Sequence, residues 1–474
     1  MTRVAEALDT LASLVGSSPV AEVAQAFDTA GFELALVGGP VRDAFLGKPV
    51  NDLDFTTSAS PDQIESIVRP LADAVWDVGR EFGTIAAQFG ENTFEITTYR
   101  ADSYDGVSRK PTVEFGSSLD EDLIRRDFTV NAMALRIPSL VLVDPYGGLN
   151  DLMAGVLRTP SRPEVSFADD PLRMMRACRF VAQLGATIEP DTASALSDMA
   201  SRIETISAER IRDELVKLLS TDTPRAGIEA FVDSGLAALV LPELALLREE
   251  RDEHRRHKDV YQHSLTVVEQ AIDLEHSRHP GSEPDVTLRI AALLHDIGKP
   301  VTKKFEPGGV VTFHHHDVVG AKMAKKRLKQ LRFDNHTVDS VYRLIELHLR
   351  FFGYADQGWS DSAVRRYVRD AGEELERLHI LTRADVTTRN RQKADRLAFA
   401  YDDLEQRIAE LSEQEELQAM RPDLNGEQIM EILGVGPSKT VGEAYRFLLE
   451  LRMEHGPLGE QEATARLKQW WAER

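Results

Sequence analysis

The chain has 474 residues, of which 42% are hydrophobic and one is cysteine, and its formal net charge is −22. These values predict a folded protein of about two to four domains and exclude a disordered chain. They also exclude a disulfide framework and a protein that coats nucleic acid indiscriminately. Because the first residues do not form a secretory signal and no apolar run reaches about 18 residues, we expect a cytoplasmic protein.

The predicted elements fall into two regions along the chain. Helical spacing of apolar residues predicts helices over residues 1–32. Residues 33–150 are dominated by short strands, with helices over 40–47 and 61–72, which is typical of an α+β domain built on a small sheet. The predicted strands are ELALVGG, NDLDFTT, TIAAQFG, TFEITTYR, TVEFG and SLVLVDP. From residue 165 to the end, helical periodicity predicts all-α structure.

An acidic strand stands out in the first region. In NDLDF, Asp52 and Asp54 alternate with Leu53 and Phe55. Side chains alternate along a strand, so the two carboxylates point the same way, with Cα atoms about 6–7 Å apart. Taken alone, the pair reads most simply as two solvated acids on a half-exposed edge strand.

The residues before this strand change that interpretation. Gly38 and Gly39 precede a short helix, where the backbone can approach an anion that the helix dipole favours. Arg42 and Asp43 lie in the first turn of the same helix. A phosphate cradle beside two parallel carboxylates is suited to hold Mg²⁺ against a triphosphate, and two such ions about 4 Å apart can activate a hydroxyl and stabilise leaving pyrophosphate.

The segment GGPVRDAFLGKPVNDLDF resembles the first motif of class II tRNA nucleotidyltransferases and bacterial poly(A) polymerases, relatives of the polymerase-β superfamily. Four further motifs of that family follow in order: RRDFTVNAMA (125–134), DPYGGLNDL (144–152), ADDPLRMMRACRF (168–180) and AERIRDEL (208–215). The resemblance covers residues 30–245 and implies a small polymerase-β-like nucleotidyltransferase head in which Asp52 and Asp54 are the catalytic Mg²⁺ ligands. The sequence departs from the family where the usual Glu-Asp of the fourth motif is Asp169–Asp170.

The fourth motif also has a physical interpretation of its own. Asp170 and Arg173 are three residues apart, so we expect them on one face of a helix. A carboxylate can accept from the amino group of cytosine or adenine while a guanidinium donates to the ring nitrogen, which would select C and A without a template. Arg176 and Arg179 continue along the helix, positioned for phosphate or for orienting the pair. The family resemblance implies a nucleotide site made of Gly38, Gly39, Arg42, Asp43, Arg126, Asp127, Asn131, Asp170, Arg173, Arg176 and Arg179.

Two further residues of the head are candidates. Glu95 falls on a later strand, where the superfamily often carries a third metal carboxylate, although an ordinary strand glutamate is the alternative. Arg109 lies in the polar segment ADSYDGVSRKPTVEF, which resembles the flexible loop of the family between its first two motifs.

The helical half contains YQHSLTVV, AALLHDIGKP, TFHHHDVVGA, IELHLRF and TRADVTTR, whose imidazoles and carboxylates suit divalent ions. The pattern resembles the HD phosphohydrolase superfamily over residues 257–390. The implied ligands are His263, His295, Asp296, His316, His348 and Asp385, holding Ni²⁺, Mn²⁺ or a similar transition metal, or Mg²⁺. The run FHHHD leaves His315 as an alternative, but Asp317 and Gly320 favour His316. Lys299, three residues after Asp296, is available to a phosphate.

These observations favour an enzyme that adds C, C and A to the 3′ end of tRNA from CTP and ATP, with no membrane or DNA partner. A poly(A) polymerase and an HD phosphohydrolase with a nucleotide-sensing head are the alternatives, and addition of only CC or only A stays open. Poly(A) polymerases typically carry a Gly-Arg-Arg-Phe-type segment and a basic tail, which this chain lacks. The predicted domains are a head (1–160), a helical neck (161–250), an HD domain (251–392) and a helical tail (393–474).

Overall fold

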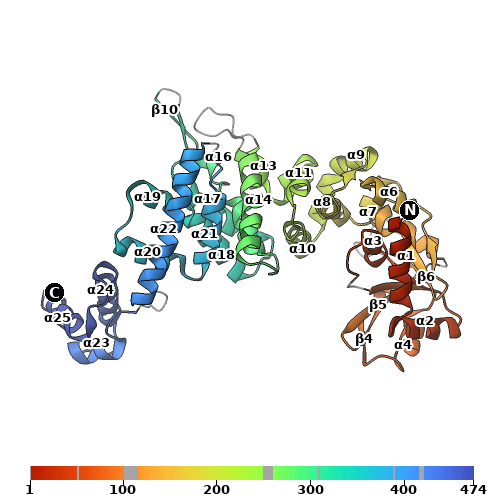
Figure 1. Cartoon of the computed structure of the whole chain (residues 1–474), viewed down its shortest axis with the longest axis horizontal. Helices are drawn as coiled ribbons and strands as arrows, with labels where there is room; N and C mark the ends of the chain where they lie inside the picture. The colour runs from red at the N-terminus through yellow and green to blue at the C-terminus, as the bar shows by residue number, and fades with distance from the viewer. Residues whose placement is uncertain are drawn as a thin grey trace. The chain divides into compact units, whose positions relative to one another are not determined.

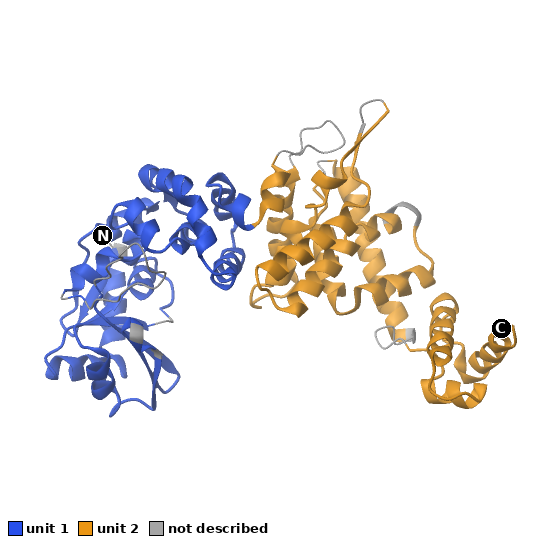
Figure 2. Cartoon of the chain, turned by 180° about the vertical axis from the view of Figure 1, so that it is seen from behind, with its two compact units in different colours: residues 1–240 blue, residues 241–474 orange. Residues whose placement is uncertain are grey.

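The computed structural model describes residues 2–50, 53–100, 116, 118–248, 260–307, 310–387, 390–415 and 421–473. The chain divides into two compact units, Met1–Val240 (unit 1) and Leu241–Arg474 (unit 2), shown in Figure 2. Within the described residues, every helix is too short or too polar to cross a membrane.

Unit 1 contains a mixed seven-stranded sheet in the order β3-β4-β5-β2-β1-β6-β7 (Figure 1). Its strands are β1 (Leu34–Val37), β2 (Leu53–Thr57), β3 (Ala74–Gly79), β4 (Thr84–Phe89), β5 (Asn92–Thr98), β6 (Ala134–Ile137) and β7 (Val141–Val143). Strands β2 and β5 pair in parallel, whereas the other neighbours are antiparallel. The sheet confirms the α+β class that the sequence predicted for the head.

Two strands of this sheet were not predicted. Strand β3 lies at the edge of the sheet, where even the apolar Trp76 is 41% exposed. Its residues therefore do not show the alternation of apolar and polar side chains that predicts a strand. Strand β6 has four residues and follows a 3₁₀ turn within the second motif, which hides its strand character. Of the predicted strand TVEFG, only Gly116 is among the described residues, and it lies outside any strand.

Helices of unit 1 pack against the sheet, and the chain continues beyond it as an all-α region. They are α1 (Thr2–Val15), α2 (Val20–Thr29), α3 (Gly39–Phe45), α4 (Pro61–Val68), α5 (Leu119–Ile124), α6 (Gly148–Ala154), α7 (Pro163–Asp169), α8 (Leu172–Leu184), α9 (Pro190–Met199), α10 (Ala208–Leu219), α11 (Arg225–Asp233) and α12 (Leu236–Val240). Short 3₁₀ helices are η1 (Arg80–Phe82), η2 (Thr129–Asn131) and η3 (Ala200–Thr205), and β8 (Val156–Leu157) pairs with β9 (Thr187–Ile188). Helix α8 packs against α10 and α11, which places the fourth and fifth motifs side by side.

Among the described residues of unit 2, the regular elements are helices and one hairpin, β10 (Lys304–Glu306) and β11 (Val310–Thr312). Its helices are α13 (Pro242–Leu247), α14 (Val260–Arg278), α15 (Val286–Leu294), α16 (Lys299–Thr302), α17 (His316–Gln330), α18 (Asn335–Leu347), α19 (Arg350–Gln357), α20 (Asp361–Ala371), η4 (Gly372–Glu374), α21 (Leu375–Ala384), α22 (Arg391–Glu415), α23 (Gly426–Leu433), α24 (Lys439–His455) and α25 (Gly459–Ala472). The last three helices have a small core of their own, made of Leu424, Ile429, Ala444, Leu448, Ala463 and Leu467.

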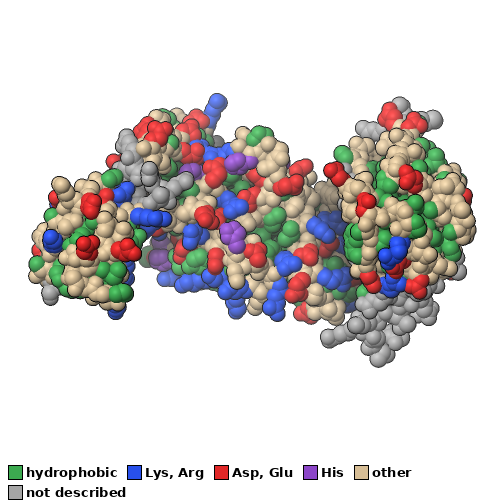
Figure 3. Space-filling model, turned by 90° about the horizontal axis from the view of Figure 1, so that it is seen from below, with side chains coloured by type: hydrophobic (Ala, Val, Ile, Leu, Met, Phe, Trp, Pro, Cys, Tyr) green, Lys and Arg blue, Asp and Glu red, His purple; other side chains and the backbone are tan. Residues whose placement is uncertain are grey.

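The charged side chains are unevenly distributed on unit 2. Figure 3 shows Lys and Arg side chains along one edge of this unit, whereas Asp and Glu are scattered over the rest of the same face. Local cationic surfaces therefore exist in a chain whose net charge is −22.

Candidate functional site

The glycine turn before α3 has the conformation that the sequence required. Gly38 has φ +72°, a region that residues with side chains seldom adopt. A Cβ atom at this position would lie 3.1 Å from Nη1 of Arg126. Gly39 begins α3 and Pro40 follows within its first turn, where proline is favoured. The second motif is thus in contact with the glycine turn of the first.

Strands β2 and β5 bring two carboxylates together. Leu53 and Phe55 are buried, and Asp54 between them is exposed, as the alternation predicted. Asp54 is the direct Cα partner of Glu95 in the parallel β2–β5 register, and Glu95 is also exposed. Adjacent residues in register share a face of the sheet, so these two carboxylates form an acidic pair on one face, suited to a divalent ion. Asp52 and Arg109 lie outside the described residues.

A buried ionic network links the first, second and fourth motifs. Arg176 donates from Nε to Oδ2 of Asp127 at 2.7 Å, and Asn131 donates from Nδ2 to Oδ1 of Asp127 at 3.0 Å. Arg42, only 5% exposed, donates from Nη1 to Oδ1 of Asn131 at 2.6 Å. Burial acts to raise the pKa of Asp127, but the charge of Arg176 and the hydrogen bonds from Asn131, Arg176 and the Phe128 amide outweigh it and lower the pKa to about 2. The first, second and fourth motifs are therefore tied together through an ionised carboxylate.

The remaining arginines of this region are also engaged. Arg42 donates from Nε to Oδ1 of Asp43 at 2.8 Å. Arg179 donates from Nε to Oε2 of the buried Glu214 at 2.7 Å, and its guanidinium lies 4.2 Å from the centre of the Phe180 ring. Sequence reasoning did not single out Glu214, although it lies in the fifth motif. In this structure Arg176 and Arg179 hold the fold of the site together through Asp127 and Glu214.

The structure corrects the placement of Asp170 on a helix with Arg173. Helix α7 ends at Asp169 and α8 begins at Leu172, and Asp170 between them is extended, with φ −142° and ψ 100°. The residue before a proline is driven out of the α region, and Pro171 follows Asp170. The carboxylate of Asp170 accepts from the Leu172 amide at 3.1 Å, so it caps the start of α8.

The partners of the two residues differ. Asp170 accepts from Nη2 of Arg210 at 2.8 Å, with 29% of its side chain and 51% of that of Arg210 exposed. Arg173 donates from Nη1 to the Ser166 hydroxyl at 2.7 Å and from Nη2 to the carbonyl oxygen of Arg125. Arg210, in the fifth motif, is therefore a member of this site that sequence reasoning missed.

The third motif has a structural explanation. Asp144 accepts from the amides of Gly148 and Leu149 at 2.6 and 3.0 Å at the start of α6. A Cβ atom on Gly148 would lie 2.1 Å from the carbonyl oxygen of Thr129. The Thr129 hydroxyl donates to the Asp151 carboxylate at 2.7 Å. The motif thus holds α6 against η2, which carries Asn131.

In unit 2 the six predicted HD residues converge on one buried cluster. Potential ligand atoms fall into two groups of three, each with its atoms within 4.8 Å of one another. The groups are His263, His295 and Asp385, and Asp296, His316 and His348. The Nε2 atom of His263 lies 2.9 Å from Oδ1 of Asp385 and 3.3 Å from Nε2 of His295, while Nε2 of His316 lies 3.3 Å from Oδ1 of Asp296. The cluster is formed by residues from α14, the end of α15, α17, and the ends of α18 and α21.

Three imidazoles of this cluster are oriented by the same kind of hydrogen bond to the backbone. The Nδ1 atoms of His295, His316 and His348 lie 2.8, 2.8 and 2.6 Å from the carbonyl oxygens three residues earlier. A carbonyl oxygen only accepts, so each Nδ1 carries a proton and each Nε2 is the ring atom directed at the cluster, where it would ligate a metal once it is deprotonated. Burial, together with the charge of His295, lowers the pKa of His348 to about 4, and its Nε2 is buried without a hydrogen-bond partner. An imidazole held neutral with its ligand atom unpaired fits a divalent metal.

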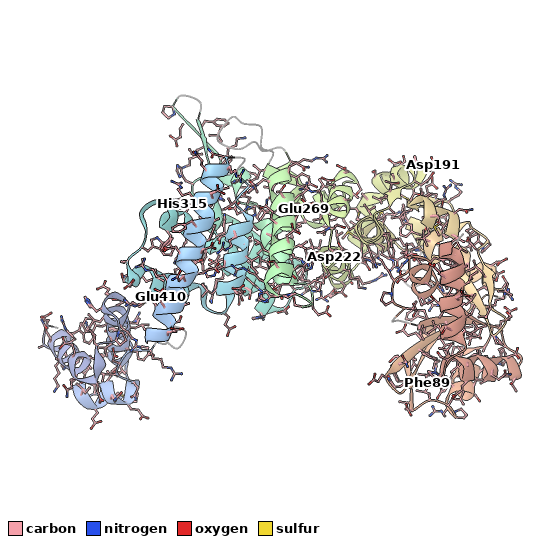
Figure 4. The ribbon with its side chains drawn as sticks, in the orientation of Figure 1. Phe89, Asp191, Asp222, Glu269, His315 and Glu410 are labelled. Carbon is pink, nitrogen blue, oxygen red and sulfur yellow. The ribbon has the colours of Figure 1, made fainter. Side chains whose placement is uncertain are left out.

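The glycine after the His-Asp pair explains how α17 reaches the cluster. A Cβ atom on Gly298 would lie 2.1 Å from the carbonyl oxygen of His316, so only glycine permits this approach. His316 therefore faces the cluster, whereas the adjacent His315, labelled in Figure 4, is exposed at the start of α17. Lys299 places Nζ 2.8 Å from Oδ2 of Asp296, at the rim of the same cluster.

Three family models match the chain. Residues 34–158 match "Poly A polymerase head domain", residues 185–247 match "Probable RNA and SrmB- binding site of polymerase A", and residues 260–390 match "HD domain". These matches confirm the predicted order of a nucleotidyltransferase head followed by an HD domain.

Two relatives differ in how much of the chain they match. The A-adding tRNA nucleotidyltransferase of Deinococcus radiodurans is 35% identical over 448 residues, which cover 92% of this chain and 95% of that protein. The CCA-adding enzyme of Bacillus subtilis is 40% identical over 208 residues, 44% of this chain and 51% of that protein. The chain thus matches about half the length of the Bacillus subtilis enzyme.

Solved structures show the same fold over the whole chain. A Bacillus stearothermophilus CCA-adding enzyme in complex with CTP superposes with a TM-score of 0.65 at 24% identity and covers 96% of this chain and 97% of its own. A Thermotoga maritima CCA-adding enzyme complexed with tRNA-CCA gives a TM-score of 0.63 at 17% identity, with 98% of each chain covered.

Proposed function

Because the chain belongs to the tRNA nucleotidyltransferase family, we propose that it adds C, C and A to the 3′ end of tRNA from CTP and ATP without a nucleic-acid template. The proposal rests on the acidic pair of Asp54 and Glu95, which lies on the same sheet as β1, the strand that leads into the Gly38–Gly39 turn. The proposed partners, tRNA and the two nucleotides, meet the protein in the cytoplasm.

The chemistry is a transfer of a nucleotidyl group. The terminal 3′-hydroxyl oxygen of tRNA forms a bond to the α-phosphorus and releases its proton to water, the bond from the α-phosphorus to the bridging oxygen breaks, and pyrophosphate leaves. Asp52 and Asp54, with Glu95 as the third carboxylate, would hold Mg²⁺, which supplies charge neutralisation for the triphosphate and the leaving group. The backbone at Gly38 and Gly39 leaves room for phosphate oxygens because neither residue carries a side chain.

Selection of the base is assigned to Asp170 and Arg173. The Asp170 carboxylate accepts from the exocyclic amino group, and the Arg173 guanidinium donates to the ring nitrogen. Arg210, 2.8 Å from Asp170, orients that carboxylate while leaving it partly exposed. The Arg125 carbonyl oxygen and the Ser166 hydroxyl accept hydrogen bonds from Arg173 and so orient its guanidinium. Uracil and guanine present the opposite pattern, so their carbonyl oxygen would face the carboxylate and their ring N–H would face the guanidinium.

The number of nucleotides added is the point on which a second candidate function rests. The Deinococcus radiodurans relative, which is matched over 95% of its length, is an A-adding enzyme, and this favours addition of the terminal A alone. The Bacillus subtilis relative, which is matched over 51% of its length, is a CCA-adding enzyme. The test offers tRNAs that end at the discriminator base, at C and at CC, with each nucleotide separately. Addition of two C residues to the first substrate from CTP, together with addition of A to the CC-ended tRNA from ATP, supports the main proposal, and extension of only the CC-ended tRNA by ATP supports the second. Long A tails would overturn both in favour of a poly(A) polymerase.

The His-Asp cluster of unit 2 supports a second activity, metal-dependent hydrolysis of phosphoesters at RNA ends. A 2′,3′-cyclic phosphate blocks extension, and its hydrolysis breaks one ring P–O bond while water supplies the new oxygen on phosphorus and a proton to the released ribose oxygen. His263, His295, Asp296, His316, His348 and Asp385 would hold a divalent ion such as Ni²⁺, Mn²⁺ or Mg²⁺, which polarises the phosphate.

The hydrolase proposal is tested on 2′,3′-cyclic AMP with each of these metals. We expect wild-type protein to hydrolyse it, and His295→Ala and Asp296→Ala to lose hydrolysis while they keep nucleotide addition. Absence of hydrolysis by wild type with every metal would instead favour an HD unit that only binds tRNA.

A further inference from the structure

The β10–β11 hairpin is joined at both ends to the His-Asp cluster. On the N-terminal side it follows α16, whose first residue Lys299 contacts Asp296 at 2.8 Å. On the C-terminal side it leads to Phe313, whose carbonyl oxygen accepts from Nδ1 of His316 at 2.8 Å. The ring of Phe313 is 3% exposed and lies 5.8 Å from Nζ of Lys299. The base of the hairpin is therefore fixed to the residues that form the cluster, and Figure 1 shows the hairpin projecting from the helices of unit 2.

The first strand of this hairpin exposes an aromatic ring among cations. Phe305 is 75% exposed, and Nζ of Lys303 lies 5.7 Å from the centre of its ring. Lys304 is exposed next to it, and Val301 on α16 is 59% exposed. Exposure alone does not mark a binding site, but a solvent-exposed ring beside a lysine, on a hairpin whose base is fixed to the His-Asp cluster, can stack on a nucleic-acid base.

We propose that this hairpin binds the single-stranded RNA end whose terminal nucleotide lies in the His-Asp cluster. Phe305 stacks on the base of the nucleotide before the terminal one, and Lys303, whose Nζ lies beside the ring, pairs with an adjoining phosphate. The inference rests on the proposed hydrolase activity of the same cluster and names what holds its RNA substrate. Aromatic rings beside cations are the usual means of binding single strands without sequence preference, since every base has a π-face.

The size and charge of the surface favour RNA over a protein partner. Among the described residues of segment 299–313, Val301 and Phe305 are the exposed large hydrophobic side chains. Two such side chains fall far short of the roughly 800 Å² per partner of a stable protein interface. One ring is enough for one base, and the lysines complement a polyanion in a chain whose net charge is −22.

The first experiment compares a mononucleotide with an oligonucleotide on the full-length, metal-loaded protein. The substrates are 2′,3′-cyclic AMP and an RNA tetranucleotide that ends in a 2′,3′-cyclic phosphate. For Phe305→Ala we expect KM for the tetranucleotide to rise about fivefold to a hundredfold with kcat retained, and KM for the mononucleotide to stay unchanged. Phe305→Trp restores the low KM. Phe399→Ala, at a 73% exposed ring on α22 of the same unit, is the matched control and leaves both substrates unaffected.

The second experiment does not depend on hydrolysis. A tetranucleotide with 4-thiouridine before its terminal nucleotide is photo-crosslinked to wild-type protein, and the modified peptide is identified by mass spectrometry. A crosslink on residues 303–306 supports the proposal. Crosslinks only elsewhere, or a tetranucleotide KM that Phe305→Ala leaves unchanged, overturn it. If wild type hydrolyses neither substrate but crosslinks at 303–306, the hydrolase proposal is wrong and the RNA-binding hairpin stands.

Discussion

The buried carboxylate of Asp127 gives a quantitative test of the network that joins three motifs of the head. Burial opposes its ionisation, but Arg176 and the hydrogen bonds around it lower its pKa from the usual 3.8 of an aspartate to about 2. A difference of this size corresponds to about 2 kcal/mol of folding free energy held by the ionised form. Because the folded-state pKa is depressed, this contribution is fully present above about pH 4 and is lost as the pH falls through about 2.

We therefore expect Asp127→Asn to lower the free energy of unfolding of unit 1 by about 2 kcal/mol at pH 7, and the difference from wild type to shrink below pH 4. Urea denaturation of the full chain, followed by pulsed hydrogen exchange on peptides from residues 119–137, reports unit 1 separately from unit 2. Asp213→Asn is the control, because Asp213 is 55% exposed in its pair with Arg212 at 2.8 Å and such pairs contribute at most about 1 kcal/mol. Equal losses in the two variants, or a difference that does not depend on pH, would refute the reasoning.

Three further predictions concern the chemistry of the two units. Asp52→Ala and Asp54→Ala should each abolish incorporation of labelled CTP and ATP into tRNA while a gel shift shows tRNA binding intact, and near-normal incorporation would remove these residues from the metal site. Arg173→Ala should lower the preference for CTP over UTP, measured as the ratio of kcat/KM, about fivefold to a hundredfold, since it removes a hydrogen bond to the base edge; an unchanged ratio would contradict base readout by the protein. Gly298→Ala should weaken Ni²⁺ binding to unit 2 in calorimetry, because its Cβ would lie 2.1 Å from a backbone carbonyl oxygen, whereas Gly436→Ala, with open space around its Cβ, should not; equal affinities would show that this close approach does not position the metal ligands.

The sequence by itself determined the classes of chemistry and their order along the chain. Metal-assisted transfer needs carboxylates in register on a strand, and a metal cluster needs imidazoles with acids, so the residue types and spacings of NDLDF and HDIG restrict what either segment can do. A strand has a fixed period of two, so the alternation of Leu53, Asp54 and Phe55 predicted the burial of these three side chains, but it did not predict that Thr56 and Thr57 are both buried.

Tertiary structure decided the partners of the charged residues. Asp127 and Arg176, or Asp170 and Arg210, are separated by 49 and 40 positions, and no local pattern indicates that they meet. The same holds for Glu95, whose place beside Asp54 follows from the parallel pairing of β2 with β5 and not from its own strand. Ion pairs and strand order depend on where whole elements pack, which a local period does not encode.

The error at Asp170 and the choice between histidines in FHHHD show two ways in which residue spacing fails to predict the position of a side chain. Helical spacing predicted one continuous helix, but Pro171 forces the residue before it into an extended conformation, and a capping carboxylate results. His316 could be favoured from its neighbours, yet its selection over His315 rests on the close contact of Gly298 with the start of α17. A spacing fixes which side chains share a face only where the helix is unbroken, and the direction in which a helix end points is set by the backbone packed against it.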